Sequence, residues 1–386
     1  MKNFVYDIPT KVYFGKDQIQ SLSELVKNLG KKLLIVYGGG SIKKNGIYDS
    51  VLEQLKKADG EWFELSGVEP NPRIATVKKG IQLCKEKKID GVLAVGGGSV
   101  IDCSKAICAG AYYNGDPWNL VMNPSLIKNA LPLIAIPTMA ATGSEMDHIA
   151  VITNEDTDEK IGTRHPLLRP IASILDPTYT FSVSPYQSAA GVADIMSHIM
   201  ESYFSKEPGL ILENVAIGLL KTCMDSGLKV LEDPEDYEAR ANLMWVSCWA
   251  INDFLKLGRP VAWSVHPIEH QLSAVYDITH GVGLAILTPH WMEYVLNENT
   301  VDIFEGFFRK LWDWQDKELD SYELVYKGIE ELNKFYAKLN LPMTLHELDI
   351  DSSQFSAMAK KAEKQVQQGF VPLSESDIVK IYEASL

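Results

Sequence analysis

Two stretches of the sequence decide the fold: Leu33-Leu-Ile-Val-Tyr-Gly-Gly-Gly-Ser41 and Gly91-Val-Leu-Ala-Val-Gly-Gly-Gly-Ser99. In each, a short apolar run leads directly into a glycine turn that ends in serine, and a helical pattern follows, over residues 47–57 and 100–111. Strands that alternate with helices in this way form a mostly parallel sheet covered by helices. The first part of the chain is therefore predicted to be an α/β domain.

The glycine turns predict a nucleotide site, because ligands of open α/β sheets lie at the carboxyl ends of the strands. Glycine lets a phosphate approach the backbone amides, and the N-terminus of the following helix adds about half a positive charge. A third apolar run, Leu131 to Ile136, ends in another turn of small residues, Pro137-Thr-Met-Ala-Ala-Thr-Gly-Ser-Glu145. Neither glycine turn spells Gly-x-Gly-x-x-Gly, which indicates a phosphate loop unlike that of the usual Rossmann unit.

A structural interpretation stands beside the nucleotide site. A single glycine turn can be an ordinary tight connection, and Ser99 with Asp102 matches the Ser-x-x-Asp spacing of a helix capping box. Capping alone could explain both residues. The recurrence of small-residue turns in one α/β half favours the nucleotide site.

The second half of the chain has a different pattern. After Leu175-Asp176-Pro177 the strand pattern fades, and long helical patterns follow, for example over residues 211–224 and 237–255. We predict two domains: an α/β dinucleotide-binding domain over residues 1–180 and an all-helical domain over residues 181–386.

Composition narrows the class of protein. The 386 residues include 46% hydrophobic residues and carry a net charge of −14, which fits a folded protein and disfavours nucleic acid as a partner. No apolar leader and no run of about eighteen apolar residues is present, so we expect a cytoplasmic protein without a membrane partner. The cysteines are odd in number, scattered and without a Cys-x-x-Cys pair, which predicts reduced packing residues.

Five residues of the helical half suggest a metal site. Asp194 and His198 are four apart within a helical pattern and share one face, and His266 and His270 repeat that spacing ahead of His280. One carboxylate with several imidazoles suits Fe²⁺ or Zn²⁺, not Mg²⁺ or Ca²⁺. Spacing alone leaves a second interpretation open, in which these are buried, hydrogen-bonded helix residues.

The first glycine turn indicates the form of the dinucleotide. It offers the amides of Gly39 and Gly40 and the hydroxyl of Ser41, without an acidic side chain to accept the adenine-ribose hydroxyls. Lys43 and Lys44 follow at once, and their charges would attract a 2′-phosphate. NADP(H) is therefore favoured over NAD(H), unless the two lysines form an ordinary solvated face.

Together these motifs resemble the iron-containing (group III) alcohol dehydrogenases. The resemblance rests on Gly96-Gly-Gly-Ser-Val-Ile-Asp102, Thr138-x-x-x-Thr-Gly-Ser-Glu145, Gly191-x-x-Asp194-x-x-x-His198 and His266-x-x-x-His270 followed by His280-Gly281. Three further stretches, 37–46, 67–73 and 276–283, are similar to the NADPH-dependent butanol dehydrogenase branch of this family. The resemblance runs from about Phe4 to Met292, and no usable motif lies beyond about Thr300.

The resemblance implies a dehydroquinate synthase-like architecture and a homodimer or larger homo-oligomer. It implies four ligands for Fe²⁺, Zn²⁺ or another divalent metal: Asp194, His198, His266 and His280. His270 matches a residue beside the metal that does not bind it, and we assign it a catalytic role as proton relay. The implied cofactor residues are Gly39, Gly40, Ser41, Asn71, Gly96, Gly97, Gly98, Ser99, Asp102, Thr138, Thr142, Ser144 and Lys160. Lys160 could equally be a surface charge.

The expected activity is metal-assisted hydride transfer between NADP(H) and short-chain primary alcohols or aldehydes of the butanol type, in a cleft between the domains. An apolar site is indicated by Val261-Ala-Trp263-Ser-Val, Met139 and Ile149. A glycerol or polyol dehydrogenase is the alternative, for which only Asp147 and His148 stand out as hydroxyl partners. A dehydroquinate synthase-like lyase would need a cationic pocket that the helical half lacks, and a non-enzymatic NADP sensor would show no metal and no turnover.

Overall fold

The computed structural model describes residues 2–207, 209–315 and 318–386. These residues form two compact units. The sheet unit comprises Asp7–Val183 together with Pro234–Asn252, and the helical unit comprises the described residues of Met1–Tyr6, Ser184–Asp233 and Asp253–Leu386. The domain division predicted from the sequence, 1–180 and 181–386, stays a prediction.

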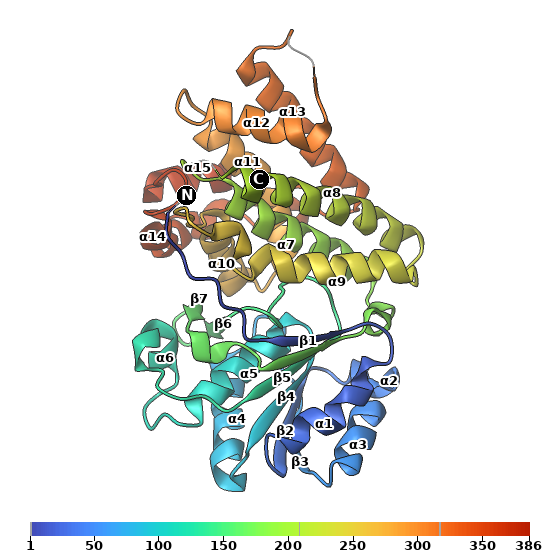
Figure 1. The fold of residues 1–386 in the computed structure, drawn as a ribbon. Coiled ribbons are helices and arrows are strands. Elements are labelled where there is room, and N and C mark those ends of the chain that lie inside the picture. Colours follow the sequence, from blue (N-terminus) through green and yellow to red (C-terminus); the bar gives the residue numbers. More distant parts are fainter. Residues whose placement is uncertain (1, 208, 316–317) are drawn as a thin grey trace. The chain divides into compact units, whose positions relative to one another are not determined.

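The sheet unit is built on six parallel strands in the order β1-β8-β5-β4-β2-β3 (Figure 1). The strands are β1 (Lys11–Phe14), β2 (Lys32–Tyr37), β3 (Glu61–Leu65), β4 (Gly91–Gly96), β5 (Leu133–Pro137) and β8 (Ala172–Leu175). A separate antiparallel hairpin consists of β6 (Ile149–Asn154) and β7 (Glu159–Arg164). The predicted parallel α/β fold is confirmed.

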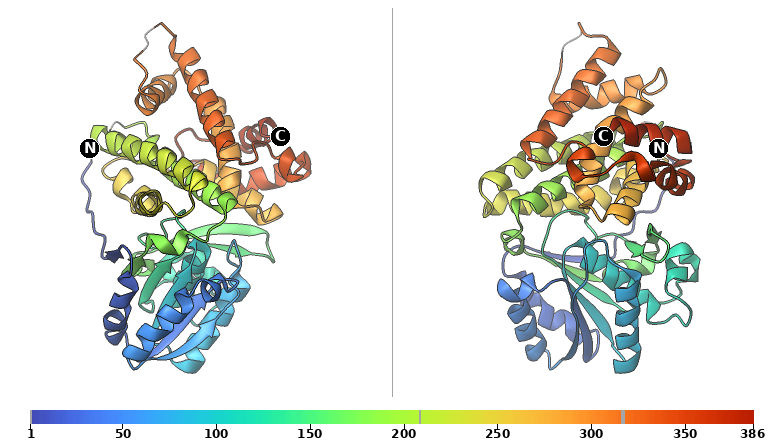
Figure 2. Two further views of the ribbon diagram at one scale, coloured as in Figure 1. Left: turned by 90° about the vertical axis from the view of Figure 1, so that its right-hand side faces the viewer. Right: turned by 180° about the vertical axis from the view of Figure 1, so that it is seen from behind.

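Helices cover both faces of the sheet, which is why the central strands are continuous apolar runs. On one face Leu34, Val92 and their neighbours pack with residues of α4 and α5, and on the other Ile35, Leu93 and their neighbours pack with residues of α1 and α3 (Figures 1 and 2). The helices of this unit are α1 (Leu22–Lys27), α2 (Ser41–Lys44), α3 (Ile47–Lys57), α4 (Ile74–Lys87), α5 (Gly98–Gly110), α6 (Trp118–Met122) and α9 (Tyr237–Ile251).

The helical unit contains α7 (Pro185–Tyr203), α8 (Leu210–Glu232), α10 (Val265–Tyr276), α11 (His280–Val295), α12 (Val301–Trp312), α13 (Ser321–Lys338), α14 (Phe355–Val366) and α15 (Glu375–Ala384). Helix α7 packs against α8 and α11, and α10 packs against α11 and α14. The described residues contain no strand after β8, as predicted. Short 3-10 helices are η1 (Gln18–Ser21), η2 (Pro124–Leu126), η3 (Pro166–Leu168), η4 (Pro177–Thr180), η5 (Phe254–Lys256), η6 (His346–Leu348) and η7 (Ser352–Gln354).

Several boundaries differ from the sequence prediction. The third apolar run forms a strand only from Leu133, the helix predicted over 211–224 continues to Glu232, and the helix predicted over 237–255 ends at Ile251. Helix α9 also belongs to the sheet unit, where Met244 and Cys248 share a core with Met146 and Leu175. An amphipathic sequence shows which face of a helix is buried, but it does not identify the elements that this face packs against.

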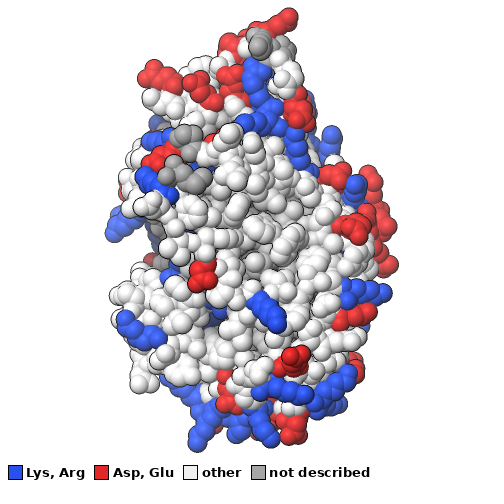
Figure 3. Space-filling model, in the orientation of Figure 1, with Lys and Arg blue, Asp and Glu red and all other residues white. Residues whose placement is uncertain are grey.

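The surface agrees with the sequence composition. On the face drawn in Figure 3, acidic side chains lie among basic ones, and wide areas carry neither. Among the described residues, no helix is both long and apolar enough to cross a membrane.

Candidate functional site

Three adjacent parallel strands bring the predicted nucleotide turns to one edge of the sheet. β5, β4 and β2 are neighbours and end at Pro137, Gly96 and Tyr37. The turn that starts at Thr138 is joined to the neighbouring one, because the Thr138 amide donates to the Gly96 carbonyl (3.1 Å). The residues at 38–41, 96–99 and 138–144 therefore share the edge where ligands of such sheets bind.

Glycine is required at two places in these turns. Gly40, which precedes α2, has a φ of 96°, a conformation that side chains disfavour. At Gly98 a Cβ atom would lie 2.4 Å from the side chain of Thr142, so this loop packs directly on the first residue of α5. Gly97 immediately precedes that helix, whose N-terminal amides are suited to an anionic group.

The capping-box interpretation of Ser99 and Asp102 is wrong. The residue that caps α5 is Gly97, without a side-chain hydrogen bond. The Asp102 carboxylate instead accepts hydrogen bonds from the Ser144 hydroxyl (2.5 Å) and the Val151 amide (2.9 Å). Asp102 thus joins α5 to the loop and strand that follow β5. Its contact with Ser144 also joins two of the predicted cofactor residues directly.

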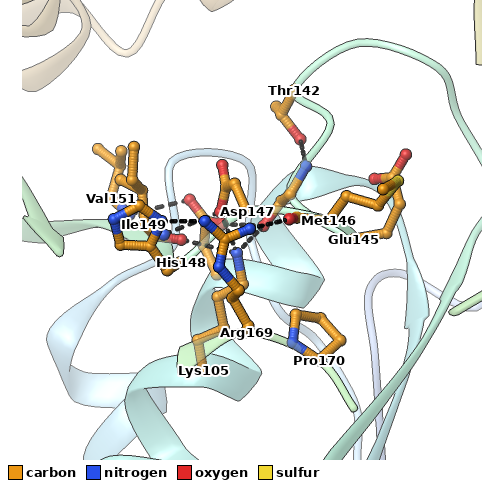
Figure 4. A network of polar contacts seen from close by, with 12 residues as sticks. Lys105, Thr142, Glu145, Met146, Asp147, His148, Ile149, Val151, Arg169 and Pro170 are labelled. Atoms are coloured by element: carbon orange, nitrogen blue, oxygen red, sulfur yellow. Dashed lines mark hydrogen bonds and ion pairs between the residues drawn. The ribbon is translucent and has the colours of Figure 1, made fainter. Parts of the chain in front are cut away.

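A buried lysine connects the same elements. Lys105 is fully buried, and its ammonium group donates to the Ser144 hydroxyl (2.8 Å). It also donates to the Asp147 carboxylate (2.5 Å) and the Ile149 carbonyl (2.8 Å) (Figure 4). Burial raises the pKa of Asp102 to about 6, although the charge of Lys105 opposes the shift. Sequence reasoning missed Lys105, since a lysine inside a helical pattern is most often exposed.

The two residues considered as partners for a polyol already bind other groups. Asp147 pairs with Lys105, and the His148 Nδ1 lies 3.0 Å from the guanidinium of Arg169 (Figure 4). The same guanidinium donates to the Met146 carbonyl (2.7 Å). These contacts explain why charged and polar residues follow the Thr-Gly-Ser turn without any need for a hydroxylated substrate.

The remaining predicted cofactor residues lie on neighbouring segments. Asn71 is buried and has a φ of 52°. The Thr153 amide of β6 donates to the carbonyl of Pro72 (2.8 Å), and Thr153 pairs with Lys160 of β7. Lys160 is only 4% exposed, so the surface-charge interpretation of this lysine is wrong.

In the helical unit, three histidines converge on one carboxylate oxygen. The Nε2 atoms of His198, His266 and His280 lie 3.5, 3.7 and 3.8 Å from Asp194 Oδ1. Asp194 and His198 share a face of α7, His266 belongs to α10, and His280 begins α11. The spacing predicted from the sequence is therefore a true convergence of side chains.

The chemistry of this group fits a divalent cation. Asp194 Oδ1 and His266 Nε2 are buried and have no hydrogen-bond partner, which is costly for polar atoms unless another group binds them. Ligands about 2.1 Å from one ion at tetrahedral angles lie about 3.4 Å apart, close to the observed separations. In the alternative interpretation, helix residues satisfied by hydrogen bonds, these atoms would not be left without a hydrogen bond.

Two buried glutamates hold the histidines. Glu201 accepts hydrogen bonds from the backbone amides of Ser264 (2.5 Å), Val265 (2.8 Å) and His266 (3.0 Å), and from His266 Nδ1. It thereby satisfies the N-terminus of α10 while it fixes one imidazole. Glu269 similarly accepts from His280 Nδ1 and from the hydroxyl of Ser273.

Both glutamates fix the tautomer of their histidine. A proton on Nδ1 leaves the lone pair on Nε2, the atom that faces Asp194. Sequence reasoning missed Glu201 and Glu269. Their positions in the sequence could have indicated both residues. Glu201 is one turn after His198 on the same helix, and Glu269 lies between His266 and His270.

Burial and mutual charges shift the pKa values of these residues in different directions. Burial would raise the pKa of Asp194, but the three histidines lower it well below 3.8. Burial likewise would lower the pKa of His266, but Glu201 and Asp194 raise it to about 9. The ring of His198 lies against those of His266 (4.6 Å between ring centroids) and Trp263 (5.1 Å), and burial lowers the pKa of His198 to about 3. A neutral His198 and an ionised Asp194 are the forms that bind a metal, and a bound cation would displace the Nε2 proton that His266 otherwise carries at neutral pH.

His270 lies beside this group. Its ring centroid is 5.4 Å from that of His280 and 6.2 Å from that of His266. With Glu269 and His280 it offers ligand atoms that lie within 4.8 Å of one another. Its assignment as a relay instead of a ligand stays a prediction.

Close packing fixes the start of α11, where His280 lies. A Cβ atom on Gly281 would be 1.9 Å from the Ala190 carbonyl oxygen of α7, so only glycine permits this approach. Gly283 similarly faces Glu269, which a Cβ atom would meet at 2.7 Å. The backbone thus holds His280 against the helix that carries Asp194.

The fold and these residues define a class: a two-unit α/β and helical protein with glycine turns at one sheet edge and a histidine–aspartate cluster whose chemistry fits a divalent cation. The family model described as iron-containing alcohol dehydrogenase matches residues 9–177, and that of the C-terminal part of the Fe-containing alcohol dehydrogenase family matches residues 188–386. The chain belongs to the iron-containing alcohol dehydrogenase family and is an oxidoreductase. The match continues to the last residue, well beyond the motifs recognised in the sequence.

Similar proteins agree over the full length. The chain is 51% identical to NADH-dependent butanol dehydrogenase A of Clostridium acetobutylicum and 35% identical to the NADPH-dependent aldehyde reductase YqhD of Escherichia coli, with 100% of each chain covered. The crystal structure of NADH-dependent butanol dehydrogenase A from Thermotoga maritima superposes with a TM-score of 0.95 at 40% identity, over 100% of this chain and 99% of that one. These relatives support the dehydroquinate synthase-like two-domain fold.

Proposed function

We propose that this enzyme transfers a hydride between NAD(P)(H) and short-chain primary alcohols or aldehydes of the butanol type, with a divalent metal in the helical unit. The observation that carries the proposal is the convergence of three imidazole nitrogens on Asp194 Oδ1, with two of these buried atoms lacking a hydrogen bond. The names of the similar butanol dehydrogenase and aldehyde reductase support the substrate class.

The proposed ligands are Asp194, His198, His266 and His280, and the proposed metal is Fe²⁺, with Zn²⁺ or another divalent ion as alternatives. When bound, such an ion stabilises negative charge on the substrate oxygen as hydride moves to or from the nicotinamide. Glu201 and Glu269, which accept from Nδ1 of His266 and His280, would keep the Nε2 lone pairs of these histidines available to the ion. Asp194 supplies a carboxylate that stays ionised throughout the neutral pH range.

His270 is the proposed proton relay. Its ring lies next to two proposed ligands, and an imidazole can accept and release a proton near neutral pH. It would exchange with solvent the proton that the alcohol loses or the aldehyde gains.

The proposed dinucleotide residues in the sheet unit are those predicted from the sequence. The α5 N-terminus and the glycines at 96–98 would receive the pyrophosphate, because their amides lie at the strand edge without Cβ atoms in the way. Asp102, Thr142 and Ser144 form one connected group beside it. The predicted preference for NADP(H) over NAD(H) rests on Lys43 and Lys44, and relatives named for NADH and for NADPH leave it to be measured.

An apolar substrate is favoured over a polyol. Trp263 packs against His198 and His266 (5.1 and 4.5 Å between ring centroids), so the proposed metal ligands have an aromatic neighbour. The carboxylate of Asp147 and the imidazole of His148 already bind Lys105 and Arg169. A chain of a few carbons suits these surroundings better than a row of hydroxyl groups.

The test is anaerobic purification with metal analysis, followed by comparison of NADPH and NADH oxidation with butyraldehyde. The proposal expects bound iron or another divalent metal and aldehyde-dependent oxidation of at least one dinucleotide. Iron-loaded protein that reduces no aldehyde would refute it, and protein without metal or turnover would favour the sensor alternative. We further propose a cytoplasmic homodimer or larger homo-oligomer, which the mass in solution would test.

A further inference from the structure

Residues around the first glycine turn form a cluster whose contacts the sequence prediction did not include. Glu64, near the end of β3, accepts hydrogen bonds from the hydroxyl groups of Tyr37 (2.6 Å) and Tyr48. Lys43, one of the two lysines on which the predicted NADP(H) preference rests, lies 3.2 Å from the same carboxylate. We call Tyr37, Lys43, Tyr48 and Glu64 the Glu64 cluster.

Lys43 contacts each of the other three residues of the Glu64 cluster. Its ammonium group lies over the rings of Tyr37 and Tyr48, 5.0 and 4.4 Å from their centroids, in addition to its ion pair with Glu64. Cation–π contacts and an ion pair together restrict a lysine that would otherwise move freely. Lys43 therefore already forms an ion pair with Glu64 at the turn where its charge was expected to attract a phosphate.

The charge of Glu64 persists at neutral pH. Burial opposes ionisation of this carboxyl, but the hydrogen bonds from Tyr37, Tyr48 and Lys43 outweigh burial and lower its pKa below 4.5. The two side chains are 45% and 32% exposed, so water and salt screen the pair only in part.

We propose that Glu64 is a specificity-determining residue that disfavours the 2′-phosphate of NADP(H) relative to the 2′-hydroxyl of NAD(H). A 2′-phosphate that reaches Lys43 must compete with Glu64 and lie near its negative charge, whereas a neutral hydroxyl meets no such repulsion. Glu64 thus counteracts the attraction expected from Lys43 and Lys44. This inference rests on the proposed function, because it requires a dinucleotide at this turn.

The experiment is to measure the Kd of NADP⁺ and of NAD⁺ by calorimetry for the wild type, Glu64→Gln and the matched control Glu61→Gln. Glu61 lies at the opposite end of the same strand, β3, and its carboxylate is 4.0 Å from the ammonium group of Lys32 in β2. Both variants lose one negative charge. For Glu64→Gln we expect the affinity for NADP⁺ relative to NAD⁺ to rise about three- to tenfold, as for removal of one partly screened charge.

Glu61→Gln should leave this ratio unchanged, and higher salt should reduce the difference between the two variants. Lys43→Gln in the Glu64→Gln background should remove the gain, and thermal unfolding of each variant checks that it is folded. An unchanged ratio in folded Glu64→Gln, or an equal rise in Glu61→Gln, would overturn this proposal alone. Failure of the wild type to bind either dinucleotide would overturn the proposed function and this proposal with it.

Discussion

Replacing Glu201 by glutamine should weaken metal binding while the helical unit stays folded. Glu201 accepts three backbone hydrogen bonds at the start of α10 and a fourth from His266 Nδ1. Glutamine has one accepting oxygen and an NH₂ group that cannot accept, so it cannot reproduce this arrangement. Its NH₂ group would face donors, and the tautomer of His266 would no longer be fixed.

The expected magnitude follows from these contacts. Loss of a carboxylate that orients a metal-binding histidine typically lowers metal affinity about ten- to a hundredfold, which is roughly 1.4 to 3 kcal/mol. Because the remaining amides of α10 lose a charged acceptor, the unfolding free energy should also fall by about 1.5 to 3 kcal/mol.

The assay is anaerobic competition for Fe²⁺ against a chelator of known affinity, together with thermal unfolding with and without the ion. The matched control is Glu213→Gln, because Glu213 also accepts from a backbone amide, that of Gly209 (2.9 Å), and from Lys310 (2.8 Å), but no proposed metal ligand. A folded Glu201→Gln protein with wild-type metal affinity, or an equal loss in Glu213→Gln, would refute the reasoning.

Three further predictions follow from other contacts. His270→Ala should lower turnover while the bound metal remains, as metal analysis of the purified variant would show; loss of the metal would instead make His270 a ligand. Gly281→Ala should destabilise the protein by several kcal/mol, because its Cβ would overlap the Ala190 carbonyl oxygen, and a wild-type melting temperature would contradict the packing argument. Burial raises the pKa of Asp102 from 3.8 to about 6, so the folded state binds this proton more tightly than the unfolded state does. The contribution of Asp102 to the free energy of unfolding should therefore fall by roughly 3 kcal/mol as the pH rises from below 3.8 to above 6. Denaturant unfolding of Asp102→Asn from pH 4 to 6.5 should lack this decrease, and an unaltered pH dependence would show that Asp102 is not its source.

Much of the sheet unit could be predicted because its strands are buried on both faces. The runs at 33–37 and 91–95 are apolar throughout, and each is followed by glycine, so strand and turn were both visible. β1 and β3 are edge strands in which every residue except Leu65 is exposed or half-buried, so they show no such pattern. The packing of α9 in the sheet unit was invisible because it depends on contacts between distant segments.

The candidate metal site was partly visible for a similar reason. A separation of four residues on a helix brings Asp194 and His198 onto one face, but the approach of His266 and His280 depends on how α10 and α11 pack. Glu201 and Glu269 were missed because a single glutamate on a helix has no distinctive spacing. The role predicted for Lys43 rested on its charge alone, because its contact with Glu64 depends on how β3 packs beside β2.

The most direct test of the central claim is an anaerobic titration of chelator-treated protein with Fe²⁺, with butyraldehyde-dependent oxidation of NADH and NADPH as the signal. The proposed site predicts no oxidation before the ion is added and a rise that saturates at a single ion per chain, with no rise in Asp194→Ala. Oxidation that needs no metal, or that Asp194→Ala retains in full, would contradict the claim that Asp194 and the three histidines hold the catalytic metal.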